Sequence, residues 1–180
     1  SDVLLENVGV NPTRTGVLSI LERMGASIER LNERDGDGEP VADLRVRAAA
    51  LCGIDIPPEL VPLAIDEFPI LFVAAACANG VTRVRGADEL RHKESDRIAT
   101  MATGLAAAGV ELETFEDGIE IRGGQLQGTT VESHGDHRIA MSFAMAALRA
   151  TGPMRINGAA TIATSFPSFT TLAHAAGLGL

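Results

Sequence analysis

The chain has 180 residues, of which 46% are hydrophobic and 22% are charged, and this balance predicts one folded domain rather than a disordered chain. The 24 acidic and 15 basic residues give a formal charge of −9, and Trp and Tyr are absent, which argues against a nucleic-acid partner. The longest apolar run, Ile70 to Ala78, is too short to cross a membrane, which takes about 18 residues. Two cysteines are too few for a disulfide framework, and the four histidines show no metal-ligand spacing with them. We therefore expect a cytoplasmic α/β protein with no membrane and no metal site.

The first segment of the chain predicts a strand, a helix and two further strands. Residues 3–8 are strand-like, and residues 16–24 carry apolar side chains at helical spacing. Strands follow over residues 26–31 and 42–46, with a hairpin turn at Asp35–Gly38 between them.

Two later stretches resemble each other. Each has an aspartate before an apolar helix, then a turn with Gly, a short strand that contains Arg, and a second helix that ends in Ala-Ala-Gly. A repeat of about 70 residues is typical of stacked supersecondary units that share a core. We therefore divide the single domain, residues 1–180, into approximate units 1–50, 51–122 and 123–180. Each copy is expected to read strand, helix, strand, helix, strand, strand.

The repeated helices are apolar enough to be mostly buried. In the last unit, this predicts that Met141, Phe143 and Met145 are core residues rather than cofactor contacts. A hairpin is expected over residues 110–121. The predicted fold class is α/β (α+β), built from βαβαββ units.

Three of the predicted helices begin next to charged residues. An aspartate at such a place is usually only a helix cap. An arginine in the first turn is less common because its charge opposes the helix dipole, so Arg97 and Arg138 at matching places of the repeat favour an anion site. The expected caps are Asp66, Ser95 or Asp96, and Asp136.

Lys93 is the only lysine among the 15 basic residues, and it lies in the most densely charged stretch of the chain. Its compact ammonium group makes it a candidate for a specific task, although an ordinary solvated side chain is the alternative. If Lys93, Arg97 and Arg138 converge, they form a pocket for a small anion with several charges. Asp66 and Glu94 are then the nearby carboxylates that can move protons.

Three motifs stand out in this part of the chain: Asp66–Pro69 (Asp-Glu-Phe-Pro), Leu90–Ile98 (Leu-Arg-His-Lys-Glu-Ser-Asp-Arg-Ile) and Asp136–Met141 (Asp-His-Arg-Ile-Ala-Met). In order and spacing they resemble the signatures of the 5-enolpyruvylshikimate-3-phosphate synthase family. The resemblance covers essentially the whole chain, which is similar to the C-terminal two-fifths of that enzyme. It implies transfer of the enolpyruvyl group of phosphoenolpyruvate to the 5-hydroxyl of shikimate 3-phosphate, with release of phosphate and without a metal or organic cofactor.

The resemblance also implies roles for individual residues. Asp66 matches a carboxylate that binds the shikimate hydroxyls and accepts a proton, and Lys93 matches a lysine at the shikimate 3-phosphate site. Glu94 matches a carboxylate implicated in proton transfer at the methylene carbon. The residues that match phosphoenolpyruvate-binding or neighbouring positions are Arg97, Arg138 and His137.

The sequence departs from the family pattern in two ways. Thr164 stands where many members have lysine, as in a branch that includes glyphosate-tolerant forms, so Thr164 is given no phosphate-binding role. The N-terminal domain, which in the family supplies further ligands, is missing, so we expect the isolated chain to be an inactive half-enzyme. The alternatives are the related UDP-N-acetylglucosamine enolpyruvyl transferase, or a domain that binds anions without catalysis.

Overall fold

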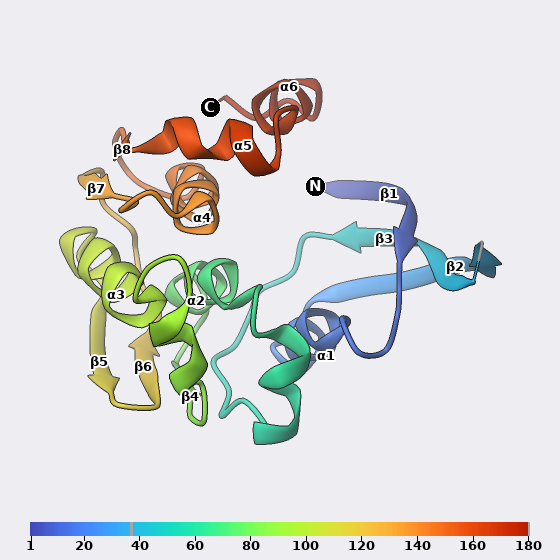
Figure 1. The fold of residues 1–180 in the computed structure, drawn as a ribbon, viewed down its shortest axis with the longest axis horizontal. Helices are drawn as coiled ribbons and strands as arrows, with labels where there is room; N and C mark the ends of the chain where they lie inside the picture. The colour runs from blue at the N-terminus through green and yellow to red at the C-terminus, as the bar shows by residue number, and fades with distance from the viewer. Residues whose placement is uncertain (37, 180) are drawn as a thin grey trace.

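The computed structural model describes residues 1–36 and 38–179, and it contains three successive groups of helices and strands (Figure 1). The first group confirms the predicted strand, helix and strand pair, and its strands are longer than predicted. They form an antiparallel sheet in the order β1-β3-β2. The turn predicted at Asp35–Gly38 includes Asp37, which lies outside the described residues. The elements are β1 (Asp2–Gly9), α1 (Gly16–Arg23), β2 (Ser27–Gly36) and β3 (Glu39–Arg47).

The second group begins with isolated parallel bridges at Cys52 and Asp55 rather than with a full strand. Its three strands form an antiparallel sheet in the order β4-β6-β5, and the predicted hairpin is present as β5 and β6. The helices are α2 (Phe68–Ala76), α3 (Arg97–Ala107) and the 3₁₀ helices η1 (Pro58–Leu60), η2 (Pro62–Ala64) and η3 (Asp88–His92). The strands are β4 (Val81–Val84), β5 (Glu111–Phe115) and β6 (Gly118–Arg122).

The third group is a parallel strand-helix-strand unit followed by short helices. Its two strands, β7 and β8, pair in parallel across α4. In the part of the chain that the structure describes, no strand pair follows the last helix, so this copy differs from the predicted order. The elements are β7 (Thr130–Glu132), α4 (His137–Ala147), β8 (Arg155–Asn157), η4 (Ala159–Thr161), α5 (Ile162–Ser165) and α6 (Phe169–Ala175).

The central core lies between α2, α3 and α4, which occupy neighbouring positions in Figure 1. The apolar sequence of α2 buries this helix on nearly all sides, as expected for its composition. Packing is close where α3 crosses α4, because a Cβ added to Gly104 would stand 2.2 Å from Cζ of Phe143. Phe143 is buried as predicted, but Met141 and Met145 are only half-buried. The prediction that these two methionines are core residues is wrong, because their side of α4 borders a pocket.

Two aspartates at the helix starts are the predicted caps. The Asp96 carboxylate accepts a hydrogen bond from the backbone N–H of Ala99 at 2.9 Å, and Asp136 accepts one from the N–H of Arg138 at 2.9 Å. Asp66 is not a cap, contrary to the prediction. Glu67 holds the cap position of α2, and the Asp66 carboxylate contacts basic side chains instead of the free N–H groups.

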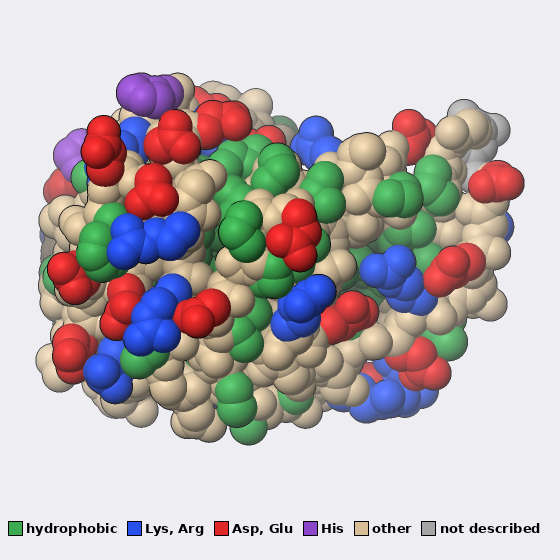
Figure 2. All heavy atoms as spheres, turned by 90° about the horizontal axis from the view of Figure 1, so that it is seen from below, with side chains coloured by type: hydrophobic (Ala, Val, Ile, Leu, Met, Phe, Trp, Pro, Cys, Tyr) green, Lys and Arg blue, Asp and Glu red, His purple; other side chains and the backbone are tan. Residues whose placement is uncertain are grey.

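The surface is mixed in charge. Figure 2 shows basic and acidic side chains interspersed over one face of the molecule. A nucleic-acid-binding surface would instead gather its basic residues on one face or stripe. None of the helices within residues 1–36 and 38–179 has the length and apolar character that a membrane crossing needs.

Candidate active site

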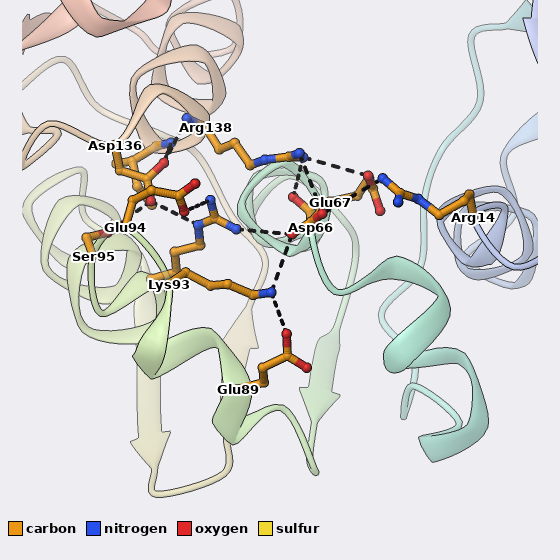
Figure 3. A network of polar contacts seen from close by, with 11 residues as sticks. Arg14, Asp66, Glu67, Glu89, Lys93, Glu94, Ser95, Asp136 and Arg138 are labelled. Atoms are coloured by element: carbon orange, nitrogen blue, oxygen red, sulfur yellow. Dashed lines mark hydrogen bonds and ion pairs between the residues drawn. The ribbon is translucent and has the colours of Figure 1, made fainter. Parts of the chain in front are cut away.

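The carboxylate of Asp66 lies among four basic side chains (Figure 3). Its Oδ1 atom is 3.5 Å from Nη1 of Arg97 and 3.7 Å from Nζ of Lys93. Its Oδ2 atom is 3.6 Å from Nη2 of Arg138 and 3.9 Å from Nη2 of Arg14. These cations come from the segment before α3, from the first turns of α3 and α4, and from the loop before α1. The fold therefore brings together Lys93, Arg97 and Arg138, the three basic residues that the sequence singled out.

Arg97 and Asp136 form a buried ion pair beneath Asp66. The side chain of Arg97 is 1% exposed and that of Asp136 is fully buried, and Nε of Arg97 donates to Oδ2 of Asp136 at 2.9 Å. Ser95 Oγ also donates to Asp136, at 3.1 Å. Burial acts to raise the pKa of Asp136, but the hydrogen bond and charge of Arg97 outweigh it and hold this pKa below its usual value. Asp136 thus connects the first turn of α3 to the start of α4.

Glu94 covers the outer side of Arg97. Its Oε2 atom accepts a hydrogen bond from Nη2 of Arg97 at 2.5 Å, while 53% of the Glu94 side chain is exposed to solvent. Lys93 lies beside it, 23% exposed, and makes an ion pair with Glu89 as well as with Asp66. Two carboxylates, those of Asp66 and Glu94, therefore contact the same guanidinium.

Arg138 holds the start of α2. Its Nη1 atom donates to the backbone carbonyl of Asp66 at 2.9 Å and lies 3.7 Å from Oε1 of Glu67. Burial raises the pKa of Glu67, and the charge of Arg138 opposes this shift. With 31% of its side chain exposed, Arg138 remains accessible to a ligand anion.

A pocket of about 200 Å³ lies beside this cluster, between α2, α4 and α6. Its charged wall consists of Asp66, Glu67 and Arg138, and half-buried Met141 and Met145 contribute to its apolar wall. A larger hollow of about 1000 Å³ lies between residues 125–130 and 151–155, where it shares no residue with the cluster. The charged groups rather than the larger hollow therefore mark the candidate site.

Two residues that the sequence singled out lie outside the network. His137 is half-buried, and no hydrogen bond or ion pair within the described residues connects it to the cluster. The hydroxyl of Thr164 donates to the carbonyl of Thr161 at 2.6 Å, as part of its own short helix. Within residues 1–36 and 38–179, no group of three or more His, Cys, Asp or Glu side chains is placed to hold a metal ion.

Sequence reasoning gave no site role to four members of the cluster, namely Arg14, Glu67, Glu89 and Asp136. It gave Asp136 only a capping role, although its place directly before His137 and Arg138 was a signal that it lies near the predicted anion site. It gave Arg14 no role, because this residue follows a turn in the first unit and no local pattern connects it with Asp66.

Comparisons with known proteins all point to the same family. The sequence model of the family EPSP synthase (3-phosphoshikimate 1-carboxyvinyltransferase) matches residues 1–172. The 3-phosphoshikimate 1-carboxyvinyltransferase of Acidithiobacillus ferrooxidans is 64% identical over 178 residues, which are 99% of this chain and 41% of the relative. That of Nitrosococcus oceani is 61% identical over 180 residues, which are 100% of this chain and 40% of the relative.

A solved structure of EPSP synthase from Acinetobacter baumannii matches with a TM-score of 0.96 and 56% identity, covering 98% of this chain and 42% of that one. The chain therefore spans about two-fifths of the length of the relatives it matches. The agreement in fold confirms the predicted α/β class. The sequence match over nearly the whole chain, together with this structural match, shows that the chain belongs to the EPSP synthase family.

Proposed function

We propose that this chain supplies one part of the active site of a 3-phosphoshikimate 1-carboxyvinyltransferase. The whole enzyme would transfer the enolpyruvyl group of phosphoenolpyruvate to the 5-hydroxyl of shikimate 3-phosphate and release phosphate. The observation that carries the proposal is the placement of Asp66 among Lys93, Arg97, Arg138 and Arg14. Such a site suits substrates that carry phosphate and carboxylate groups, and the name of the relatives, 3-phosphoshikimate 1-carboxyvinyltransferase, indicates the acceptor.

Addition of the hydroxyl to the double bond needs one proton removed and another delivered. Asp66 is the proposed proton acceptor, since its carboxylate is partly exposed and lies 3.7 Å from the ammonium of Lys93, which would hold shikimate 3-phosphate. Glu94 is the proposed proton donor to the methylene carbon. As the methylene carbon is protonated, the neighbouring carbon that bears the phosphate oxygen gains cationic character, which the two nearby carboxylates would stabilise. The hydroxyl oxygen would bond to that carbon. The C–O bond to phosphate would then break as the new methyl group gives up a proton, which restores the double bond and releases phosphate.

The carboxylate of phosphoenolpyruvate would bind to Arg97 and Arg138, with His137 as a neighbour. A guanidinium suits this task because it can donate two parallel hydrogen bonds to one carboxylate. Glu94 already occupies the outer nitrogen of Arg97. The incoming anion would therefore replace Glu94 on Arg97, which would leave the Glu94 carboxyl beside the reacting carbon.

The remaining three-fifths of the relatives' length would supply the other half of the site. We propose that residues 1–180 form one C-terminal domain made of units 1–50, 51–122 and 123–180, and that its partner is the N-terminal domain of the same enzyme. Catalysis by positioning needs both halves around the substrates, so the isolated chain should be inactive. A cytoplasmic location remains a prediction.

Release of inorganic phosphate from phosphoenolpyruvate and shikimate 3-phosphate tests the proposal. The assay would compare this chain alone, the amino-terminal portion of the Acidithiobacillus ferrooxidans relative alone, and the two mixed. We expect release only from the mixture, and none when UDP-N-acetylglucosamine replaces shikimate 3-phosphate. A silent mixture in which gel filtration shows that the two parts associate would contradict the proposed reaction. Turnover by the chain alone would contradict the half-enzyme.

A further inference from the structure

We infer that Arg14 is an additional substrate-binding residue, whose guanidinium binds an anionic oxygen of the ligand that lies against Asp66. The inference deepens the proposed function and rests on it for the identity of that ligand. The observations behind the inference do not depend on the proposed reaction. They are the free hydrogen-bond donors of Arg14, the position of its loop and the charge of the surrounding cluster.

Arg14 has unused hydrogen-bond donors. Of the four cations around Asp66, Lys93, Arg97 and Arg138 each donate to an acceptor of the protein. The guanidinium of Arg14 makes no hydrogen bond within the described residues, and its 3.9 Å distance to Asp66 Oδ2 is too long to be one. Its side chain is 68% exposed, the largest value among the four. Its five N–H groups are therefore available to a ligand.

The loop that carries Arg14 is held in place. Oδ1 of Asn11 accepts hydrogen bonds from the N–H and the hydroxyl of Thr13, at 3.0 and 2.8 Å, and the N–H of Arg14 donates to the Asn11 carbonyl at 2.9 Å. Two residues later the chain passes so close to η2 that a Cβ on Gly16 would stand 2.7 Å from the carbonyl carbon of Leu63. Because η2 leads directly into the site, this contact fixes the loop against it.

The direction of the side chain agrees with this position. Figure 3 shows Arg14 extending from the loop before α1 toward Asp66 and Glu67, on the side opposite Lys93. A ligand anion bound between Arg138 and the open side of Asp66 would meet the guanidinium of Arg14 there.

The positive charge of Arg14 reduces the repulsion that the cluster would exert on a ligand anion. Five carboxylates and four cations give the cluster a formal charge of −1. Without Arg14 it would be −2, and a site for doubly or triply charged anions would repel them more strongly. A long, exposed ion pair contributes little to folding, so the contact with Asp66 does not account for Arg14 as a stabilising residue.

The test compares Arg14→Ala with Arg23→Ala in the mixture of this chain and the amino-terminal portion. Arg23 is an exposed arginine on α1 and carries the same charge, but it takes no part in the cluster. We expect Arg14→Ala to raise KM by roughly tenfold or more, as is typical for the loss of a charged hydrogen bond. KM is measured separately for phosphoenolpyruvate and shikimate 3-phosphate, and the one that rises identifies the substrate whose oxyanion Arg14 binds.

The control variant Arg23→Ala should leave both KM values within about twofold, and the Tm of both variants should match that of the wild type. If both KM values stay unchanged in Arg14→Ala, the inference is wrong. A fall in kcat alone would also overturn it, because Arg14 would then act on Asp66 rather than on the ligand.

A second measurement separates this inference from the proposed reaction. If the wild-type mixture shows no turnover, the proposed function fails, but anion binding can still be followed by NMR. Inorganic phosphate would be titrated into the mixture with only this chain labelled with ¹⁵N. A shift of the Arg14 Nε–H signal without a shift of the Arg23 signal supports the inference, and an unchanged Arg14 signal overturns it.

Discussion

Replacing Asp136 by alanine should destabilise the chain by about 3–5 kcal/mol, because the variant leaves the guanidinium of Arg97 buried without its Nε acceptor. The structure supports a value in this range. Arg97 is 1% exposed, so water cannot replace the lost carboxylate, although Glu94 and Asp66 still neutralise part of its charge. Loss of the cap on α4 contributes about 1 kcal/mol of this total.

Asp96→Ala is the matched control. Asp96 caps α3 at the equivalent place of the repeat, but 37% of its side chain is exposed and its ion pair with Arg91 is near the surface. It should cost only about 1 kcal/mol. The free energy of unfolding would be measured by urea denaturation followed by circular dichroism. If the two variants differ by less than about 1 kcal/mol, the reasoning about the buried ion pair is refuted.

The same pair predicts a pH dependence. The pKa of Asp136 is lower in the folded chain than the ordinary value of 3.8, so the folded state binds fewer protons than the unfolded state in this range. The stabilisation is therefore fully present above pH 3.8 and is lost as the pH falls through the pKa that Asp136 has in the folded chain. The difference in the free energy of unfolding between the wild type and Asp136→Ala should therefore become smaller in that acidic range. If this difference in the free energy of unfolding is the same at all pH values, the lowered pKa of Asp136 in the folded chain is contradicted.

Three further substitutions test the packing and electrostatics around the site. Burial raises the pKa of Glu67, so ionisation of this carboxyl lowers the stability of the wild type as the pH rises above 4.5. The Tm of Glu67→Gln should therefore rise relative to that of the wild type from about pH 4 to about pH 7. A Tm difference between the two proteins that stays constant over this range would contradict the prediction. Gly104→Ala should destabilise by about 1–3 kcal/mol in urea denaturation, despite the helix propensity of alanine, because its Cβ meets Phe143; a gain in stability would refute this. Gly16→Ala should destabilise the chain by a similar amount, because the added Cβ meets the backbone of η2. Gly9→Ala is the control and should cost less than about 1 kcal/mol, because no atom lies within 4 Å of a Cβ added there. Equal losses of stability in the two variants would contradict the close approach of Gly16 to η2.

The sequence was most informative about local structure. Helical spacing and turn residues located most elements, because apolar periodicity and backbone preferences act over a few neighbouring residues. The caps Asp96 and Asp136 were predicted for the same reason. The cap at Asp66 was predicted wrongly, because its contacts with four basic side chains come from parts of the chain that local preference does not describe.

The candidate site was predictable only in part. Arg97 and Arg138 were recognisable because a first-turn arginine is unusual, and the repeat placed them at matching positions. Burial determines how much a polar contact contributes to stability, and the sequence does not show which side chains are buried. The full burial of Asp136 therefore could not be predicted, and neither could the half-exposure of Met141 and Met145.

The proposed reaction depends most on Asp66 as the proton acceptor at the centre of the cluster. The most direct test is the kcat for phosphate release by Asp66→Asn in the mixture of this chain and the amino-terminal portion. Asp55→Asn is the control, since Asp55 is 76% exposed and pairs with Arg83 outside the cluster. We predict that kcat falls by about 10²–10⁴ in Asp66→Asn and stays unchanged in Asp55→Asn, with both variants still folded by circular dichroism. A kcat of Asp66→Asn within about twofold of the wild type would contradict the assignment of Asp66 as the proton acceptor.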